Sequence, residues 1–99
     1  MLVINCIYYG NELTNDNNTN GGVAGIVGSF AASSLANTAI VNSAAFPTKV
    51  STGSSNANIA GIAGYANTVT INNCYCPTPA SAFYFNGAAS GSSRGSIYG

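Results

Sequence analysis

The side chains best suited to acid–base or metal chemistry in this chain are two carboxylates and three thiols. Glu12 and Asp16 lie four positions apart in the polar segment "NELTNDNNTN", where paired carboxylates could act as general acid and base or offer oxygens to calcium. The segment lacks EF-hand spacing, so a solvated turn is the preferred interpretation. The chain has no histidine, which removes the commonest general base and any Ser-His-Asp triad. We therefore expect no catalytic residues, no cofactor and no metal.

The three cysteines are Cys6, Cys74 and Cys76. One Cys-x-Cys pair with a single remote partner does not match the ligand spacing of zinc sites. The spacing therefore does not predict a zinc site.

Charge is nearly absent from the chain. Of 99 residues, two are basic and two acidic, for a net charge of zero. Nucleic acid is not expected as a partner, because phosphate contacts need clustered Lys or Arg. A membrane span is not expected either, because the uncharged interval 17–48 holds many asparagines, serines and glycines. Hydrophobic residues make up 46%, which argues against disorder along the whole chain, and zero net charge favours self-association.

Two short signatures recur and alternate along the sequence. Ala-Gly-Ile-x-Gly occupies 24–28 and 60–64, with a degenerate copy at 96–99. An apolar-x-Asn-Cys/Ser signature places its asparagines at Asn5, Asn42 and Asn73; the third copy is followed by Tyr75. Such periods indicate a repeat architecture, in which each unit contacts its neighbours.

The connection between the two signatures differs in length between the units. It is "SFAASSLANTA" in the first full unit and "YANTVT" in the second. A difference of five residues with both signatures intact predicts a loop insertion within a repeat array.

Local patterns favour strands. In 67–76, Val69, Ile71, Asn73 and Tyr75 alternate with polar residues and cysteines, which predicts one strand with these four on the same side. The glycine-interrupted apolar runs are poor helix material. The alanine-rich segment 31–45 is the one stretch with a helical alternative, and its serines and asparagines argue against an uninterrupted helix.

These patterns predict an all-β chain, a parallel β-helix of two full repeats with partial repeats at both ends, expected to continue beyond Met1 and Gly99. Equivalent residues of successive coils would lie about 4.8 Å apart. Cys6 and Cys74 would then lie two spacings, or about 9.6 Å, apart, too far for a disulfide, so we expect none between them. The residues expected to build the repeat are an asparagine ladder of Asn5, Asn42 and Asn73, tight glycine corners at Gly25, Gly28, Gly61 and Gly64, and interior isoleucines Ile26 and Ile62.

The segments "GGVAGIVG" and "NIAGIAGYANTVTINNCY" resemble the GLUG-type repeats of large secreted and surface-attached proteins. The matching residues are Gly25, Ile26 and Gly28, again Gly61, Ile62 and Gly64, and then Ile71, Asn73, Cys74 and Tyr75. Alanine replaces the glycine that precedes Gly25 and Gly61 in the family pattern. The resemblance implies a right-handed β-solenoid within an adhesin-like protein, and it implies no catalytic residues.

The units predicted on this basis are 1–22 (the end of a partial coil and a polar loop), 23–58, 59–93 and 94–99 (the start of a further coil), in a single array over 1–99. We expect a non-catalytic structural or adhesive segment of a larger secreted or cell-surface protein. It would act as a stalk or as a surface that binds a glycan or a protein. Its secretory signal would lie outside the chain, and the sequon at 17–19 is compatible with export.

Two alternatives stay open at this point. One is a self-assembling fibre of the cross-β type, which uncharged, Asn-rich strands would suit. The other is an ice-binding solenoid, which would need a flat threonine array that Thr38, Thr68 and Thr70 do not supply. The tyrosines and phenylalanines could line a glycan-binding face, although packing within the repeat is the preferred interpretation.

Overall fold

The computed structural model describes residues 1–15, 22–34, 36–53, 57–85, 94–95 and 97. These residues form short strands and one 3-10 turn, η1 (Ala80–Ala82), so the predicted all-β class is confirmed. The segment 31–45 contains strands and no helix among its described residues. The strands are β1 (Leu2–Ile4), β2 (Ile7–Tyr8), β3 (Glu12–Asn15), β4 (Gly22–Val23), β5 (Val27–Ala31), β6 (Ala39–Val41), β7 (Ala44–Ala45), β8 (Lys49–Thr52), β9 (Asn58–Ala60), β10 (Ala63–Asn67), β11 (Thr70–Asn72), β12 (Phe83–Phe85) and β13 (Arg94–Gly95).

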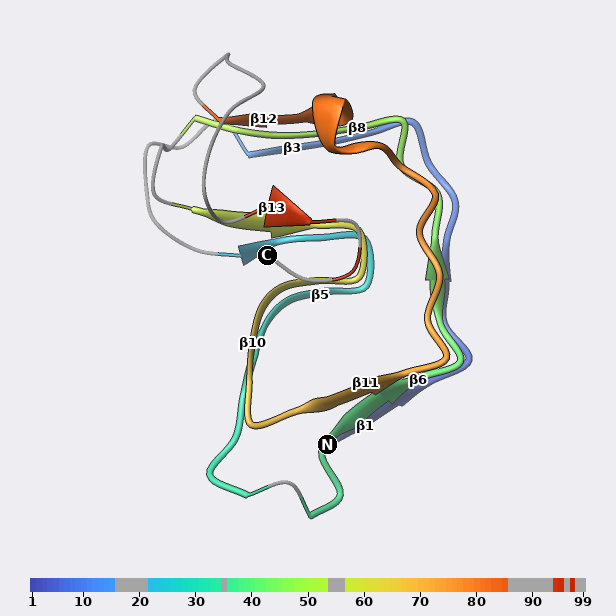
Figure 1. The fold of residues 1–99 in the computed structure, drawn as a ribbon, viewed down its shortest axis with the longest axis vertical. Coiled ribbons are helices and arrows are strands. Elements are labelled where there is room, and N and C mark those ends of the chain that lie inside the picture. Colours follow the sequence, from blue (N-terminus) through green and yellow to red (C-terminus); the bar gives the residue numbers. More distant parts are fainter. Residues whose placement is uncertain (16–21, 35, 54–56, 86–93, 96, 98–99) are drawn as a thin grey trace.

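The strands form five small sheets in which every described pair is parallel. We call β1–β5 the first level, β6–β10 the second and β11–β13 the third. Each three-stranded sheet takes one strand from each level, with the second-level strand in the middle. Paired residues are 36 or 37 positions apart between the first two levels and 31, 33 or 35 apart between the second and third. Viewed down the shortest axis, the three paths therefore lie one behind another (Figure 1).

The difference in spacing has a local origin. Between β5 and β6 the connection is 32–38, seven residues, whereas between β10 and β11 it is 68–69, two residues. The five additional residues lie where the sequence comparison places the insertion, and the longer connection extends beyond the shorter one at the lower end of Figure 1. A change in loop length is thus absorbed without disturbing the strands on either side.

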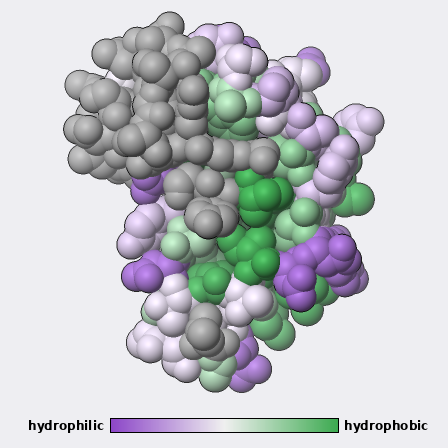
Figure 2. Space-filling model, in the orientation of Figure 1, coloured by the Kyte–Doolittle hydropathy of each residue, from purple (hydrophilic) through white to green (hydrophobic). Residues whose placement is uncertain are grey.

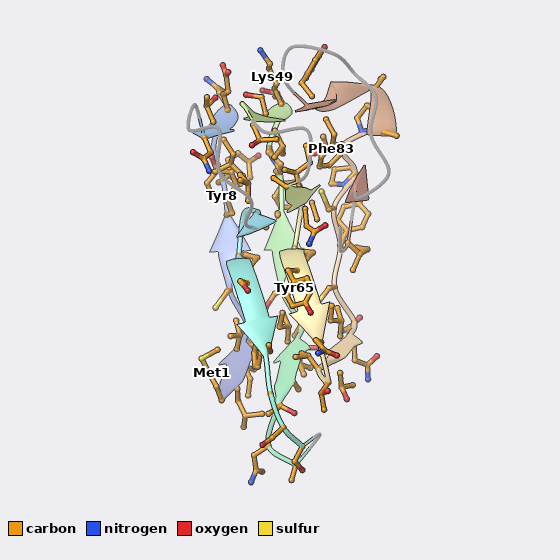
Figure 3. All side chains as sticks on the ribbon, turned by 90° about the vertical axis from the view of Figure 1, so that its left-hand side faces the viewer. Met1, Tyr8, Lys49, Tyr65 and Phe83 are labelled. Atoms are coloured by element: carbon orange, nitrogen blue, oxygen red, sulfur yellow. The ribbon has the colours of Figure 1, made fainter. Side chains whose placement is uncertain are left out.

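The second level supplies most of the core. Ile40 has no exposed surface, because Val3 pairs with it on one side and Ile71 on the other. Val3 and Ile71 are themselves only half-buried, since each has a neighbour on one side alone. Ile59 and Val50 are likewise fully buried in a second cluster with Phe83. Figure 3 shows the levels side by side, with β5 in cyan next to β10 in yellow.

Asparagines make the corners that follow the first sheet. Asn5, Asn42 and Asn73 have φ values of 58°, 52° and 53°, in the left-handed region. Asparagine visits this region more readily than most residues, because its short polar side chain can hydrogen-bond locally. The backbone N–H of Asn5 donates to Val41 O, and that of Asn42 donates to Asn72 O. The three corners therefore lie in register on successive levels.

The single strand predicted over 67–76 is wrong, because β10 ends at Asn67 and only Thr70–Asn72 form a strand after it. β11 ends before the left-handed corner at Asn73, and the corner shifts the alternation of side chains. Ile71 and Cys74 pack against the core, whereas Tyr75 is 59% exposed. The simple period of two fails here because a left-handed residue interrupts the pleat.

Close approach of backbones explains two of the glycines. A Cβ on Gly64 would lie 2.6 Å from Val23 N and 2.7 Å from Gly28 O, and one on Gly22 would lie 1.5 Å from Gly28 O. The backbones of β4, β5 and β10 thus meet where no side chain fits.

The left-handed conformation of Thr68 leads to a stability prediction. Thr68 has φ 58° and lies in register with Asn37, which has φ 57°. A β-branched residue is strained in this region, at a cost on the order of 1 kcal/mol or more. We expect Thr68→Asn to raise the free energy of unfolding by about 1 kcal/mol in urea denaturation. Asn37→Thr is the matched control and should lower it by a similar amount; an unchanged or lower stability of Thr68→Asn would contradict the strain argument.

Candidate functional site

The outer face of β2 and β7 carries large apolar side chains that the core does not use. Ile7 is 70% exposed, Tyr9 is 85% exposed and Tyr75 is 59% exposed. Ile7 pairs with Ala44, and Ala44 is bridged to Tyr75, so one row crosses all three levels. We call Ile7, Tyr9, Phe46 and Tyr75 the aromatic face.

The rings of the aromatic face touch one another. The Tyr9 and Phe46 ring centroids are 5.3 Å apart with an interplanar angle of 41°, and those of Phe46 and Tyr75 are 6.0 Å apart at 65°. Both separations lie in the range that aromatic pairs favour. The half-buried Phe46 thus joins two exposed tyrosines into one row of rings.

Backbone hydrogen bonds hold this face in place. The N–H of Ala44 donates to Cys6 O at 2.9 Å, that of Ala45 to Tyr75 O at 2.9 Å and that of Phe46 to Tyr8 O at 3.0 Å. Ala45 is fully buried directly behind the face. The rings therefore extend from a paired backbone rather than from a loop tip.

A column of exposed amides borders the aromatic face. Asn5, Asn42 and Asn73 precede Ile7, Ala44 and Tyr75 by two residues each, and all three asparagines are exposed. Asn73 Nδ2 donates a hydrogen bond to Asn42 Oδ1. An amide carries two donors and an acceptor, so this column retains hydrogen-bonding capacity toward solvent.

The repeat residues expected from sequence occupy two places. The three asparagines lie at the corner beside the aromatic face. Ile26 and Ile62 pack in the first core cluster, where Ile62 has no exposed surface. The N–H of Gly25 donates to Gly61 O at 2.8 Å, and Gly28 lies beside Gly64 in the register of β5 and β10.

A column of sulfur and oxygen lies behind the asparagine corner. The Cys6 N–H donates to Ser43 Oγ at 3.2 Å, and the Tyr75 N–H donates to Ser43 O at 3.0 Å, which puts Ser43 between Cys6 and Cys74. Ser43 is 2% exposed, and its hydroxyl donates to Val41 O at 3.0 Å. All three cysteines are free thiols. The hydroxyl of Ser43 is thus occupied by the backbone.

Glu12 and Lys49 form an ion pair between β3 and β8. Glu12 Oε1 lies 3.6 Å from Lys49 Nζ, and this nitrogen lies 5.0 Å from the ring centroid of Tyr84. Both charged side chains are about half exposed, so the pair adds little stability. Asp16 lies outside the described residues. The paired-carboxylate and calcium interpretations, which need Asp16, are therefore not tested by the structure. In the described part of the chain, no three His, Cys, Asp or Glu side chains gather as a metal site would require.

Sequence reasoning did not single out Ile7 or Phe46. A usable indication was present, because at least one aromatic residue follows the repeated asparagine of each unit within four positions: "NCIYY", "NSAAF" and "NCYCP". The sequence pattern did not reveal the left-handed backbone at each asparagine. This corner directs the side chain two positions later outward, as at Ile7 and Tyr75.

Comparison with protein-family models, with curated proteins and with solved structures finds no significant match. The resemblance to GLUG repeats therefore stays a prediction. Among the described residues, no helix has the length and apolar character needed to cross a bilayer.

The column of Cys6, Ser43 and Cys74 allows a test of the register. Ser43→Cys would place a thiol about 4.8 Å from each native one, within disulfide reach, whereas the native pair lies about 9.6 Å apart. We expect oxidised Ser43→Cys to form a disulfide with Cys6 or Cys74 in non-reducing peptide mapping. Ser51→Cys is the control, because its partners on β3 and β12 carry no thiol. A Cys6–Cys74 crosslink in the native sequence would overturn the register.

Proposed function

We propose that the chain is a non-catalytic structural and adhesive segment of a larger secreted or cell-surface protein. It would fold as a right-handed parallel β-solenoid and present the aromatic face to a carbohydrate. The observation that carries the proposal is a row of exposed rings on a hydrogen-bonded sheet face, bordered by amides.

The pairing pattern supports the solenoid. Every described strand pair is parallel, and its partners are one repeat apart in sequence. Repeat proteins of this kind stack units so that each contacts its neighbours. Crossovers between parallel strands of one sheet are right-handed in nearly all proteins, which agrees with the hand that the GLUG resemblance implies.

The make-up of the aromatic face supports a neutral carbohydrate as ligand. Strands β2 and β7 contain no charged residue, so nothing on them would select an ionic group. Exposed tyrosines offer a flat apolar ring and a hydroxyl together, which suits them to surfaces where one side is apolar and the other wet. Sugar rings present the same combination of apolar C–H faces and hydroxyls, and the amides of Asn42 and Asn73 could bond those hydroxyls.

The exposed size of the face supports binding over packing. Isolated apolar side chains on a surface need no explanation, but a contiguous patch marks an interaction site. Tyr9 loses little solvent exposure by contacting Phe46, so its ring contributes little to the core. We propose an extracellular or cell-surface location as part of the same function. The glycosylation sequon at 17–19 is compatible with this location and lies outside the described residues.

The proposal predicts that loss of a ring weakens carbohydrate binding. In affinity electrophoresis through gels containing neutral polysaccharides such as glucans, mannans and xylans, at least one polysaccharide should retard the native protein. Tyr9→Ala and Tyr75→Ala should each weaken that binding about tenfold, which corresponds to about 1.4 kcal/mol.

Tyr65→Ala is the matched control. Tyr65 is 40% exposed on β10, which pairs with β5 and belongs to a different sheet from β2 and β7; Figure 3 shows its side chain. Its removal should leave retardation unchanged. Absence of retardation by every polysaccharide, or equal weakening by Tyr65→Ala, would contradict the carbohydrate assignment.

A further inference from the structure

The aromatic face runs across the strands, with one ring on each level. Tyr9 follows β2, Phe46 follows β7, and Tyr75 of the third level is bridged to Ala44 of β7. The successive ring centroids are 5.3 and 6.0 Å apart, close to the spacing of about 4.8 Å between neighbouring strands. The line of rings is therefore parallel to the direction in which the levels are stacked.

The outward direction of these side chains is a property of the sheet and not of its ends. Side chains stand roughly perpendicular to a sheet, and Ala45, one position after Ala44, is fully buried on the inner side. Ile7 and Tyr75 are the neighbours of Ala44 on either side, so they leave the sheet outward with it. A further level would lie beside this row and would not cover it. The face is thus accessible in a single chain and in a longer array alike.

The amide column, made of Asn5, Asn42 and Asn73, runs in the same direction as the rings. Its members occupy equivalent left-handed corners on the three levels. Figure 2 looks down the stack and shows hydrophilic side chains gathered at the lower right, where the chain turns after β1 and β6 in Figure 1. An apolar line and a hydrogen-bonding line therefore lie side by side along the stack.

The hydrogen bond within the amide column leaves both a donor and an acceptor exposed. Asn73 Nδ2 donates to Asn42 Oδ1, and within the described residues Asn42 Nδ2 and Asn73 Oδ1 have no partner. A hydroxyl can both donate and accept, whereas a carboxylate only accepts and an ammonium group only donates. The column is therefore complementary to hydroxyl groups, as the uncharged strands β2 and β7 are to a neutral ligand.

The separation of the rings sets the length of the ligand. A six-membered sugar ring built from bonds of about 1.5 Å is about 3 Å across. Neighbouring centroids of the face are 5.3 and 6.0 Å apart, so one sugar ring stacks on one aromatic ring and does not reach the next. A chain of three sugars is needed to cover Tyr9, Phe46 and Tyr75.

We propose that the aromatic face binds a linear, uncharged oligosaccharide that lies across the strands. One sugar stacks on each of Tyr9, Phe46 and Tyr75, and the hydroxyl groups along one edge of the ligand bond the amide column. The inference rests on the proposed carbohydrate-binding function, and it adds the direction of the ligand, its length and the edge by which it is held. An extended peptide offers few hydroxyl groups, and its binding is an outcome that the experiment distinguishes.

Competition by sugars of increasing length tests the proposal. Oligosaccharides of one to six sugars, prepared from the polysaccharide that retards the protein most, are added to the affinity gel. The concentration that halves the retardation should fall about tenfold from one sugar to two and again from two to three, because each sugar gains one ring contact, and should then stay level. An uncharged peptide of glycine and serine should not displace the protein.

Tyr9→Ala removes the ring of the first level and should move the plateau from three sugars to two. Tyr65→Ala is the matched control and should keep the plateau at three. A monosaccharide as effective as the trisaccharide, a plateau that Tyr9→Ala does not move, or displacement by the peptide would overturn the proposal. The first two results would leave carbohydrate binding itself intact, whereas retardation by no polysaccharide would remove both proposals.

Asn42 and Asn37 provide a matched pair of variants for the amide column. Both are exposed and have left-handed backbones, with φ values of 52° and 57°, and glycine adopts that conformation without strain. Asn42→Gly removes the central amide and should raise the half-displacement concentration of the trisaccharide about fivefold. Asn37→Gly lies in the connection 32–38 and should leave it unchanged. Equal effects of the two substitutions would contradict the role of the amide column.

Discussion

Parallel backbone pairing between segments 31 to 37 residues apart is the interaction on which the rest of this molecule depends. A chain of 99 residues has little volume for a core, and four charged residues supply almost no ion pairs. Pairing with neighbours on both sides satisfies the backbone of the second level and buries its side chains, so that Ile40, Val50 and Ile59 have no exposed surface. Among the described residues, the outer levels have this support on one side only, which is why Val3 and Ile71 are less buried than Ile40.

The left-handed asparagine corner separates the structural part of each repeat from the part that faces solvent. Before the corner, Ile40 points to the interior; after it, Ser43 and Ala45 point inward while Ala44 and Phe46 face outward. Because the corner recurs in register at Asn5 and Asn73, the outward residues of successive levels lie in rows. The aromatic face is therefore a product of the same periodicity that builds the core, although its individual residues differ between repeats.

The sequence predicted the class of fold and the location of the inserted loop because both depend on properties that a single chain displays: strand-forming residues and the distance between signatures. It did not predict the outward direction of Tyr75. That direction depends on one backbone angle at Asn73, and asparagine is compatible with both extended and left-handed conformations. Ile7 and Phe46 were missed for a related reason, since the aromatic face assembles only when residues 37 positions apart are placed side by side. Gly64 was expected as a corner, whereas close packing of backbones is what excludes a side chain there, as it also does at Gly22.

The long separation between paired residues also bears on how fast the chain folds. Among the described strands, none pairs within its own level, so the first level pairs only once the second has been brought alongside it. Closing that loop of 36 or 37 residues costs conformational entropy before any sheet contact is gained. Proteins dominated by such non-local pairing fold in milliseconds to seconds. We expect the first two levels to set the rate of folding, with the third adding quickly to the template that they provide.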